Sequence, residues 1–127
     1  MNGSVVHFEV PYDDADRARA FYSDVFGWNI QQMPEFDYNS VSTGPTSDEG
    51  MPSEPGYIGG GMFQRQDDIN RPVITIDVPD MQKALATIAD HGGSAVGEPM
   101  DVGDMGIAGY FTDSEGNLMG LWQTKTP

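Results

Sequence analysis

The sequence contains one pattern twice, and this repeat constrains the fold more than any single residue does. Residues 4–10 alternate apolar and polar side chains and precede an amphipathic segment that ends at Gly27. Residues 72–78 alternate in the same way, before a second amphipathic segment that ends at Gly92. Three further strand-like stretches follow each amphipathic segment. Alternation with a period of two indicates a strand, and repetition of a whole unit indicates a duplicated architecture.

We therefore predict an α+β fold in which two βαβββ modules form a curved mixed sheet around a cavity. The whole chain, 1–127, is expected to be a single domain. Module one covers about 4–63, a polar linker 64–71 and module two about 72–124. The sequence contains no cysteine, which excludes disulfides, thiolate metal ligands and a cysteine nucleophile.

The predicted elements are bounded by capping and turn residues. Asp13 or Asp14 can cap the first helix and Asp80 the second, because carboxylates accept hydrogen bonds from the free N–H groups of a first helical turn. Gly27 suits the left-handed end of the first helix. The predicted strands are 4–10, 28–33, 36–43 and 57–63, then 72–78, 94–98, 106–112 and 117–124.

Helical spacing predicts a buried stripe on each helix. The stripes consist of Ala18, Phe21, Tyr22, Val25 and Phe26 in the first helix, and of Met81, Ala84, Leu85 and Ile88 in the second. Between the predicted strands 36–43 and 57–63, residues 44–56 are turn formers and acids. This composition predicts a structureless loop, which is either a mobile lid or a surface loop without a function. The run 59–61 is all glycine, which weakens a strand unless a ligand or a partner strand approaches its backbone closely.

The charge is strongly negative, with 20 acidic residues against 6 basic ones and a net charge of −14. Such a field repels polyanions, so we expect no nucleic-acid partner. The same composition fits either general solubility or an acidic groove for a cationic ligand. We expect no membrane partner, since no apolar run approaches the roughly 18 residues of a membrane span. The first residues have neither a basic region nor a long apolar run, so the expected compartment is the cytoplasm.

Strand phase singles out His7 and Glu9, which lie opposite the helix-facing residues of the first strand. Together they can be a base beside a carboxylate, half of a metal site, or a polar pair on an exposed face. His91 lies at a helix end, where capping explains it. The same phase argument predicts further residues on the cavity wall, as a ligand-binding set: Tyr38, Met62, Thr75, Tyr110 and Trp122. Rings combined with a few polar groups are typical of sites for small organic molecules.

Several of these segments resemble a known superfamily. His7–Pro11 and Ala20–Trp28 look like the opening of the glyoxalase/bleomycin-resistance/extradiol-dioxygenase proteins, the vicinal oxygen chelate superfamily. Ile76–Val78, His91–Gly93 and Asp113–Asn117 look like the second half. The resemblance covers nearly the whole chain, is nearest to small single-domain glyoxalase-like proteins, and implies the fold described above. It does not imply one activity, because the superfamily hosts many.

The resemblance also implies where a metal would be bound. Metal-dependent members supply one ligand from each of strands one, four, five and eight. These positions correspond to His7 (or to Val5 if the following turn holds an insertion), Gly60–Gly61, Val73 and Gly120. Only His7 among them has a side chain that can donate a lone pair to a metal. We therefore expect neither a metal nor any other cofactor.

The function that we expect is metal-independent binding of a neutral or cationic small organic molecule. An alternative is a lyase or isomerase that uses His7 and Glu9 as catalytic acid and base, with or without a weakly held divalent ion. A third is an interaction domain whose cavity is closed by its own aromatic rings. In each case we expect a homodimer, because single modules of this kind leave sheet edges to be covered.

Overall fold

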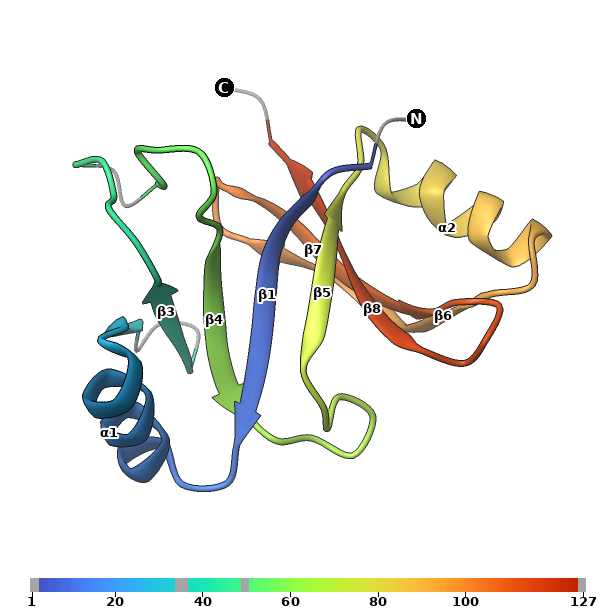
Figure 1. Ribbon diagram of the computed structural model, residues 1–127. Helices are drawn as coiled ribbons and strands as arrows, with labels where there is room; N and C mark the ends of the chain where they lie inside the picture. The colour runs from blue at the N-terminus through green and yellow to red at the C-terminus, as the bar shows by residue number, and fades with distance from the viewer. Residues whose placement is uncertain (1–2, 34–36, 49–50, 126–127) are drawn as a thin grey trace. The chain divides into compact units, whose positions relative to one another are not determined.

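The computed structural model describes residues 3–33, 37–48 and 51–125 (Figure 1). By its contacts the chain divides into two compact units. One unit is His7–Pro72, and the other joins Met1–Val6 to Val73–Pro127. The two units contain the two βαβββ modules that the repeat predicts, so the α+β fold class is confirmed. Within the described ranges, neither helix is long and apolar enough to cross a membrane.

The His7–Pro72 unit places its four strands in the order β2-β3-β4-β1. β4 pairs in parallel with β1 and antiparallel with β3, and β2 pairs antiparallel with β3. Figure 1 shows β4 and β1 side by side, with α1 beside them. The elements are β1 (Val5–Tyr12), α1 (Ala15–Phe26), β2 (Asn29–Met33), β3 (Tyr38–Ser42) and β4 (Gly59–Gln64). The connection between the predicted strands 28–33 and 36–43 lies outside the described residues.

Helix α1 is bounded as the capping residues predict. The Asp14 carboxylate accepts a hydrogen bond from the Arg17 N–H at 3.0 Å, which satisfies one free donor of the first turn. Gly27 adopts the left-handed conformation, with φ 71°, and ends the helix. Between α1 and the strands lies a core of Tyr12, Val41 and Met62. Phe8 and Val10 of β1 pack against this core, as their predicted phase requires, whereas Val6, predicted on the same face, is 36% exposed.

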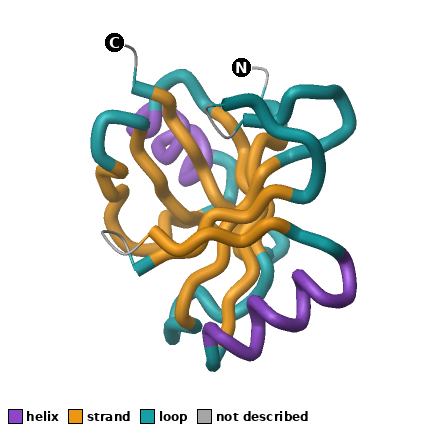
Figure 2. The backbone as a smooth tube through the Cα atoms, turned by 90° about the vertical axis from the view of Figure 1, so that its left-hand side faces the viewer, coloured by secondary structure: helices purple, strands orange, loops and turns teal. Residues whose placement is uncertain are grey.

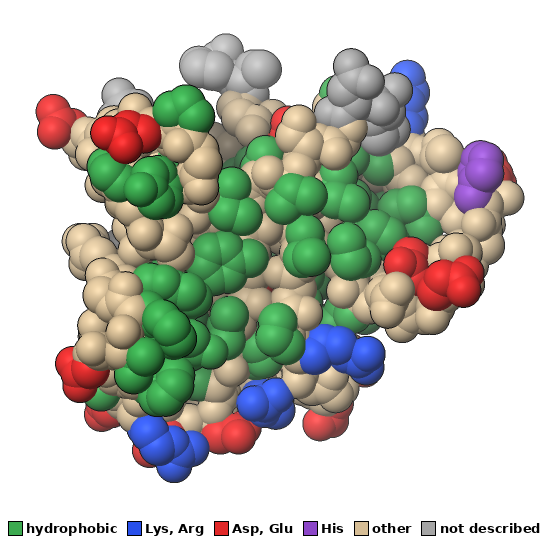
Figure 3. Space-filling model, in the orientation of Figure 1, with side chains coloured by type: hydrophobic (Ala, Val, Ile, Leu, Met, Phe, Trp, Pro, Cys, Tyr) green, Lys and Arg blue, Asp and Glu red, His purple; other side chains and the backbone are tan. Residues whose placement is uncertain are grey.

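The predicted buried stripe of α1 is wrong in part. Ala18 and Tyr22 pack against the core, but Phe21, Val25 and Phe26 are 53%, 57% and 61% exposed. Each helical residue turns the side chain by about 100°, so a stripe centred on Ala18 and Tyr22 leaves Phe21 and Val25 on the neighbouring flank. Figure 3 shows apolar side chains gathered on the surface in the region of α1.

The second unit has the strand order β5-β8-β7-β6. β8 pairs in parallel with β5 and antiparallel with β7, and β6 pairs antiparallel with β7. The Asp77 N–H donates to the Ser4 carbonyl at 2.8 Å, which ties the first residues of the chain to β5. The elements are β5 (Val73–Asp77), α2 (Met81–Asp90), β6 (Ser94–Val102), β7 (Gly106–Thr112) and β8 (Leu118–Thr124).

The predictions for α2 are confirmed. Asp80 caps α2 by accepting from the Lys83 N–H at 3.0 Å. Met81 and Ala84 are buried in the core of this unit, and Leu85 and Ile88 pack against it. In the turn between β7 and β8, the Asp113 carboxylate accepts from the backbone N–H groups of Glu115 and Asn117, each at 2.9 Å. Figure 2 shows α2 and α1 as the two purple segments beside the orange strands.

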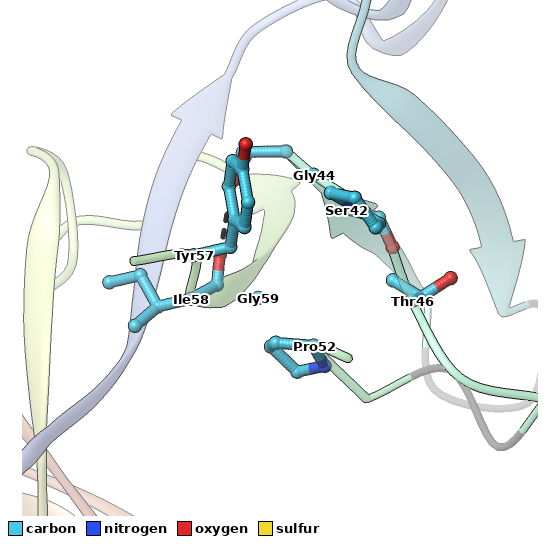
Figure 4. A pocket seen from close by; sticks show the side chains of 9 residues that line it. Ser42, Gly44, Thr46, Pro52, Tyr57, Ile58 and Gly59 are labelled. Carbon is cyan, nitrogen blue, oxygen red and sulfur yellow. Dashed lines mark hydrogen bonds between the residues drawn. The ribbon is translucent and has the colours of Figure 1, made fainter. Parts of the chain in front are cut away.

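The loop between β3 and β4 is not structureless, contrary to the prediction. Thr46 and Pro52 form an antiparallel bridge, and the Ser53 N–H donates to the Pro45 carbonyl at 3.0 Å. The Tyr57 ring packs onto Gly44, where any side chain would collide with it (Figure 4). The pocket beside these residues has a volume of about 10 Å³, room for about one water molecule. This pocket is therefore too small for an organic ligand.

Candidate functional site

Three polar side chains of the His7–Pro72 unit form one hydrogen-bonded group, which we call the His7 cluster. His7 Nε2 lies 2.9 Å from the Tyr38 hydroxyl oxygen. The Tyr38 hydroxyl donates to Glu9 Oε2 at 2.7 Å. Glu9 is 7% exposed, although it carries a carboxylate. A buried carboxylate is expensive unless it is hydrogen-bonded, so the Tyr38 hydroxyl stabilises it.

The strand register explains how these residues meet. His7 and Glu9 lie two apart on β1 and share one face, while Tyr38 begins β3 on the other side of β4. Glu9 pairs with Gly61 of β4, and a side chain on Gly61 would overlap the Tyr38 ring and hydroxyl. Tyr38 thus reaches Glu9 across a strand position that has no side chain.

The glycine run of β4 therefore makes room for aromatic rings of the same unit. Tyr38 covers Gly61, and a side chain on Gly60 would meet the Phe8 ring at 2.5 Å. The sequence predicted a close approach to this backbone but assigned it to a ligand or a partner strand. That assignment is corrected here: the approaching groups are the Tyr38 and Phe8 rings, which the spacing along one strand does not identify.

The environment of His7 favours the neutral imidazole. Burial lowers the pKa of His7 below its ordinary value, and the nearby Glu9 carboxylate raises it by a smaller amount. A neutral imidazole has one nitrogen that donates and one that accepts. His7 is therefore equipped to act as an acceptor or a base at neutral pH.

The other predicted wall residues occupy different places. Thr75, Tyr110 and Trp122 belong to the second unit, where Gly120 pairs with both Thr75 and Tyr110. Thr75 is 6% exposed, and its hydroxyl lies 2.7 Å from where a Cβ on Gly120 would be. Trp122 donates from its indole nitrogen to the Thr124 hydroxyl at 3.0 Å. Within this unit the three lie on the face opposite α2, as strand alternation predicts.

Met62 lies on the helix side of β4 rather than beside the His7 cluster. It is 0% exposed and packs with Tyr12 and Val41 beneath α1. Its partner on β1 is Val10, which also packs against this core. The predicted phase of β4 was therefore shifted by one residue, because an all-glycine run offers no alternation from which to read the phase.

A buried polar group on the helix side was not predicted. Asn39 is 3% exposed, donates to the Tyr12 hydroxyl at 3.0 Å and accepts from Arg19 at 3.1 Å. Arg19 also pairs with Asp16. A pocket of about 290 Å³ is lined by residues of β1, α1, β2 and β3, including Asn39 and Tyr38. The sequence feature that could have indicated this buried polar group is an asparagine within a predicted strand.

The donor set does not fit a bound metal ion. Within 3–33, 37–48 and 51–125, no group of three or more His, Cys, Asp or Glu side chains is arranged to hold one. At the positions that the resemblance implies, the Tyr38 ring covers Gly61 and the Thr75 side chain packs against Gly120. His7 Nε2 is already engaged by Tyr38. A structural or catalytic zinc needs at least three protein ligands, which these residues do not supply.

Comparisons of the sequence with known proteins give consistent matches. Residues 4–44 match the family model described as bleomycin resistance protein-like N-terminal. A glyoxylase-like domain-containing protein from Didymella fabae is 27% identical over 122 residues, 92% of this chain and 91% of that protein. The protein CFP32 of Mycobacterium bovis, named as a glyoxylase, is 26% identical over 112 residues. That match covers 88% of this chain and 42% of CFP32, so the chain spans under half of that relative.

Solved structures have the same fold. A methylmalonyl-CoA epimerase in complex with methylmalonyl-CoA and NH4+ aligns with a TM-score of 0.66 and 18% identity, covering 98% of this chain and 99% of that one. A hypothetical protein from Bacillus halodurans C-125 aligns with a TM-score of 0.65 and 10% identity, covering 100% and 98%. At such identities the likeness establishes the fold and not the activity.

Proposed function

Because the chain belongs to the glyoxalase/bleomycin-resistance/dioxygenase superfamily, we propose that it binds a small organic molecule at the His7 cluster without a metal ion. The observation that carries this proposal is the Tyr38 hydroxyl, which joins a buried carboxylate to a neutral imidazole. Packing alone does not require a carboxylate at Glu9, and an apolar residue there would avoid its desolvation. A few convergent polar groups are typical of ligand sites.

We propose a neutral or cationic ligand. Glu9 is the charged member of the cluster, and the chain has a net charge of −14. Such a field disfavours anionic ligands. A CoA ester, of the kind held by the epimerase neighbour, carries phosphate groups and fits this field poorly. We therefore infer that this chain differs from that neighbour in ligand class.

The binding test compares two ligand classes on three proteins. Cationic glycopeptides and neutral aromatic metabolites are screened by tryptophan fluorescence and by the shift in melting temperature. Glu9→Gln should weaken a cationic ligand by about 1–3 kcal/mol and leave a neutral one nearly unchanged, because the amide keeps the shape and removes the charge. Glu98→Gln, an exposed position of β6, is the matched control and should change neither. If neither ligand class shifts the signal of the unmodified protein, the binding proposal fails.

A second candidate function is a lyase or isomerase reaction with His7 as general base. The observation that favours it is the position of His7, which is partly buried beside the Tyr38 hydroxyl, where burial lowers the pKa of the imidazole and favours its unprotonated form. In this case His7→Gln should abolish turnover of a ligand that still binds, so that the loss of turnover is far larger than the loss of affinity. A ligand that binds but is never converted would contradict the catalytic function, and binding would then be the function that remains.

We also propose that two copies associate through the exposed flank of α1. Phe21, Val25 and Phe26 are exposed there, and the Phe21 and Phe26 ring centroids are 6.3 Å apart. Arg17 precedes Phe21 by about one turn and Asp24 follows it by nearly one turn. Two α1 helices packed antiparallel around Phe21 would bring Arg17 near Asp24 of the partner subunit, so the charges of the flank complement themselves.

Sedimentation tests this surface. The unmodified chain should sediment at about twice 13.8 kDa, and Phe21→Ser should sediment as a monomer. Exposed Tyr57→Ser is the control, because Tyr57 lies outside α1. A monomer at all concentrations, or a dimer that Phe21→Ser does not weaken, contradicts the proposed interface.

A further inference from the structure

The hydrogen bonds of the His7 cluster depend on which of its groups carry a proton to donate. The Tyr38 hydroxyl has one proton and donates it to Glu9 Oε2. An ionised carboxylate only accepts hydrogen bonds, and a neutral imidazole carries a proton on one of its two nitrogens. With its proton directed to Glu9, the Tyr38 hydroxyl can only accept from His7 Nε2, which lies 2.9 Å away.

We infer that Tyr38 is a positioning residue that holds His7 as the Nε2–H tautomer and leaves Nδ1 as the unprotonated ring nitrogen. Nε2 then donates within the protein, to the Tyr38 hydroxyl. In this tautomer the lone pair of the ring lies on Nδ1, which takes no part in the contact with the Tyr38 hydroxyl. Nδ1 is thus the atom that His7 offers to a ligand as acceptor or base.

The ligand class follows from this tautomer, and this step rests on the proposed function. A site that presents an unprotonated nitrogen favours a ligand with an O–H or N–H donor over a ligand of the same shape without one. The preference is expected to be about three- to tenfold for one hydrogen bond. Tyr38 itself is then a residue of the protein's internal network, and His7 is the residue that contacts the ligand.

The second histidine provides an internal reference with the opposite tautomer. His91 Nδ1 lies 2.9 Å from the Thr87 carbonyl oxygen. A carbonyl oxygen only accepts, so neutral His91 must carry its proton on Nδ1. The sequence contains 2 histidines, so the signals of one are assigned as soon as the other is replaced.

The test is a long-range ¹H–¹⁵N correlation spectrum of the ligand-free protein, prepared without a histidine tag. It is recorded at about pH 8, well above the ordinary histidine pKa, and assigned with His7→Gln. We expect the Nε2–H pattern for His7 and the Nδ1–H pattern for His91. An Nδ1–H pattern for His7 would overturn the inference, because it would make Glu9 the proton donor of the cluster.

Tyr38→Phe tests the positioning role, because it removes the hydroxyl and keeps the ring that covers Gly61. We expect the His7 pattern to become a mixture of the two tautomers, while the His91 pattern is unchanged. Tyr57→Phe, which removes a hydroxyl outside the cluster, should alter neither histidine. A pure Nε2–H pattern for His7 in Tyr38→Phe would show that another group sets the tautomer.

Phenol and its methyl ether, anisole, test the ligand class, since they share a ring and only phenol donates. Phenol should shift the His7 Nδ1 resonance and bind about three- to tenfold more tightly than anisole. Equal binding would refute the donor requirement. Binding of neither probe at the cluster would count against the ligand class and the proposed function together. The spectrum of the free protein decides the tautomer in every case.

Discussion

Replacing Gly61 with alanine should disrupt the hydrogen bonds of the His7 cluster by displacing the Tyr38 ring. The added methyl group would overlap the Tyr38 ring and hydroxyl, so the ring must move away from Glu9. The hydrogen bond to a charged partner is worth about 1.5–3 kcal/mol and the bond to His7 about 0.5–1.5 kcal/mol. We therefore expect Gly61→Ala to lower the free energy of unfolding by about 2–4.5 kcal/mol, measured by urea denaturation.

Two comparisons show whether that loss comes from Tyr38. Gly59→Ala on the same strand meets its nearest atom at 3.7 Å, an ordinary contact, and should change the stability by less than about 1 kcal/mol. In a double-mutant cycle, Tyr38→Ala should relieve most of the cost of Gly61→Ala, because the colliding ring is gone. Additive losses in that cycle would refute the account of why β4 has a glycine at this position.

Three further predictions concern charge, metal and packing. The contribution of neutral His7 to the free energy of unfolding is complete above pH 6.5, the ordinary histidine pKa. It is lost as the pH falls toward the lower pKa of His7 in the folded protein, because the unfolded chain takes up the proton first. His7→Gln should flatten this part of the stability–pH curve, and an unchanged curve would contradict this prediction. Elemental analysis of protein purified without chelator should find well under one transition-metal ion per chain, and chelator should leave the melting temperature unchanged; a full equivalent lost in His7→Gln would overturn this. Met62→Ala should destabilise by about 2–5 kcal/mol in urea, as a buried core residue does, without altering the affinity of a ligand for the cluster.

Local signals in the sequence predicted most of the fold. Asp14 and Asp80 cap the helices as predicted, and Gly27 ends α1 in the left-handed conformation. Each of these depends on a few neighbouring residues, which is why the sequence is sufficient. Strand phase also placed His7 and Glu9 on one face, because alternation along β1 is unbroken.

The features that were missed depend on contacts between distant segments. Helical spacing shows that α1 is amphipathic but not that Phe21 lies on its exposed flank. The glycine run hid the phase of β4, so Met62 was assigned to the wrong face. The role of Gly61 depends on Tyr38, whose ring comes from another strand. Asn39 was missed because its partners, Tyr12 and Arg19, lie far from it in the sequence.

The central claim is that the His7 cluster binds an organic molecule that donates a hydrogen bond, without a metal ion. The most direct measurement is a crystal structure of the protein soaked with phenol together with Zn²⁺, Mn²⁺ or Ni²⁺. The account predicts phenol density with its hydroxyl within hydrogen-bond distance of His7 Nδ1, and no ion beside His7. An ion bound to His7 in place of the organic molecule, or phenol bound only in the pocket beside Asn39, would contradict it.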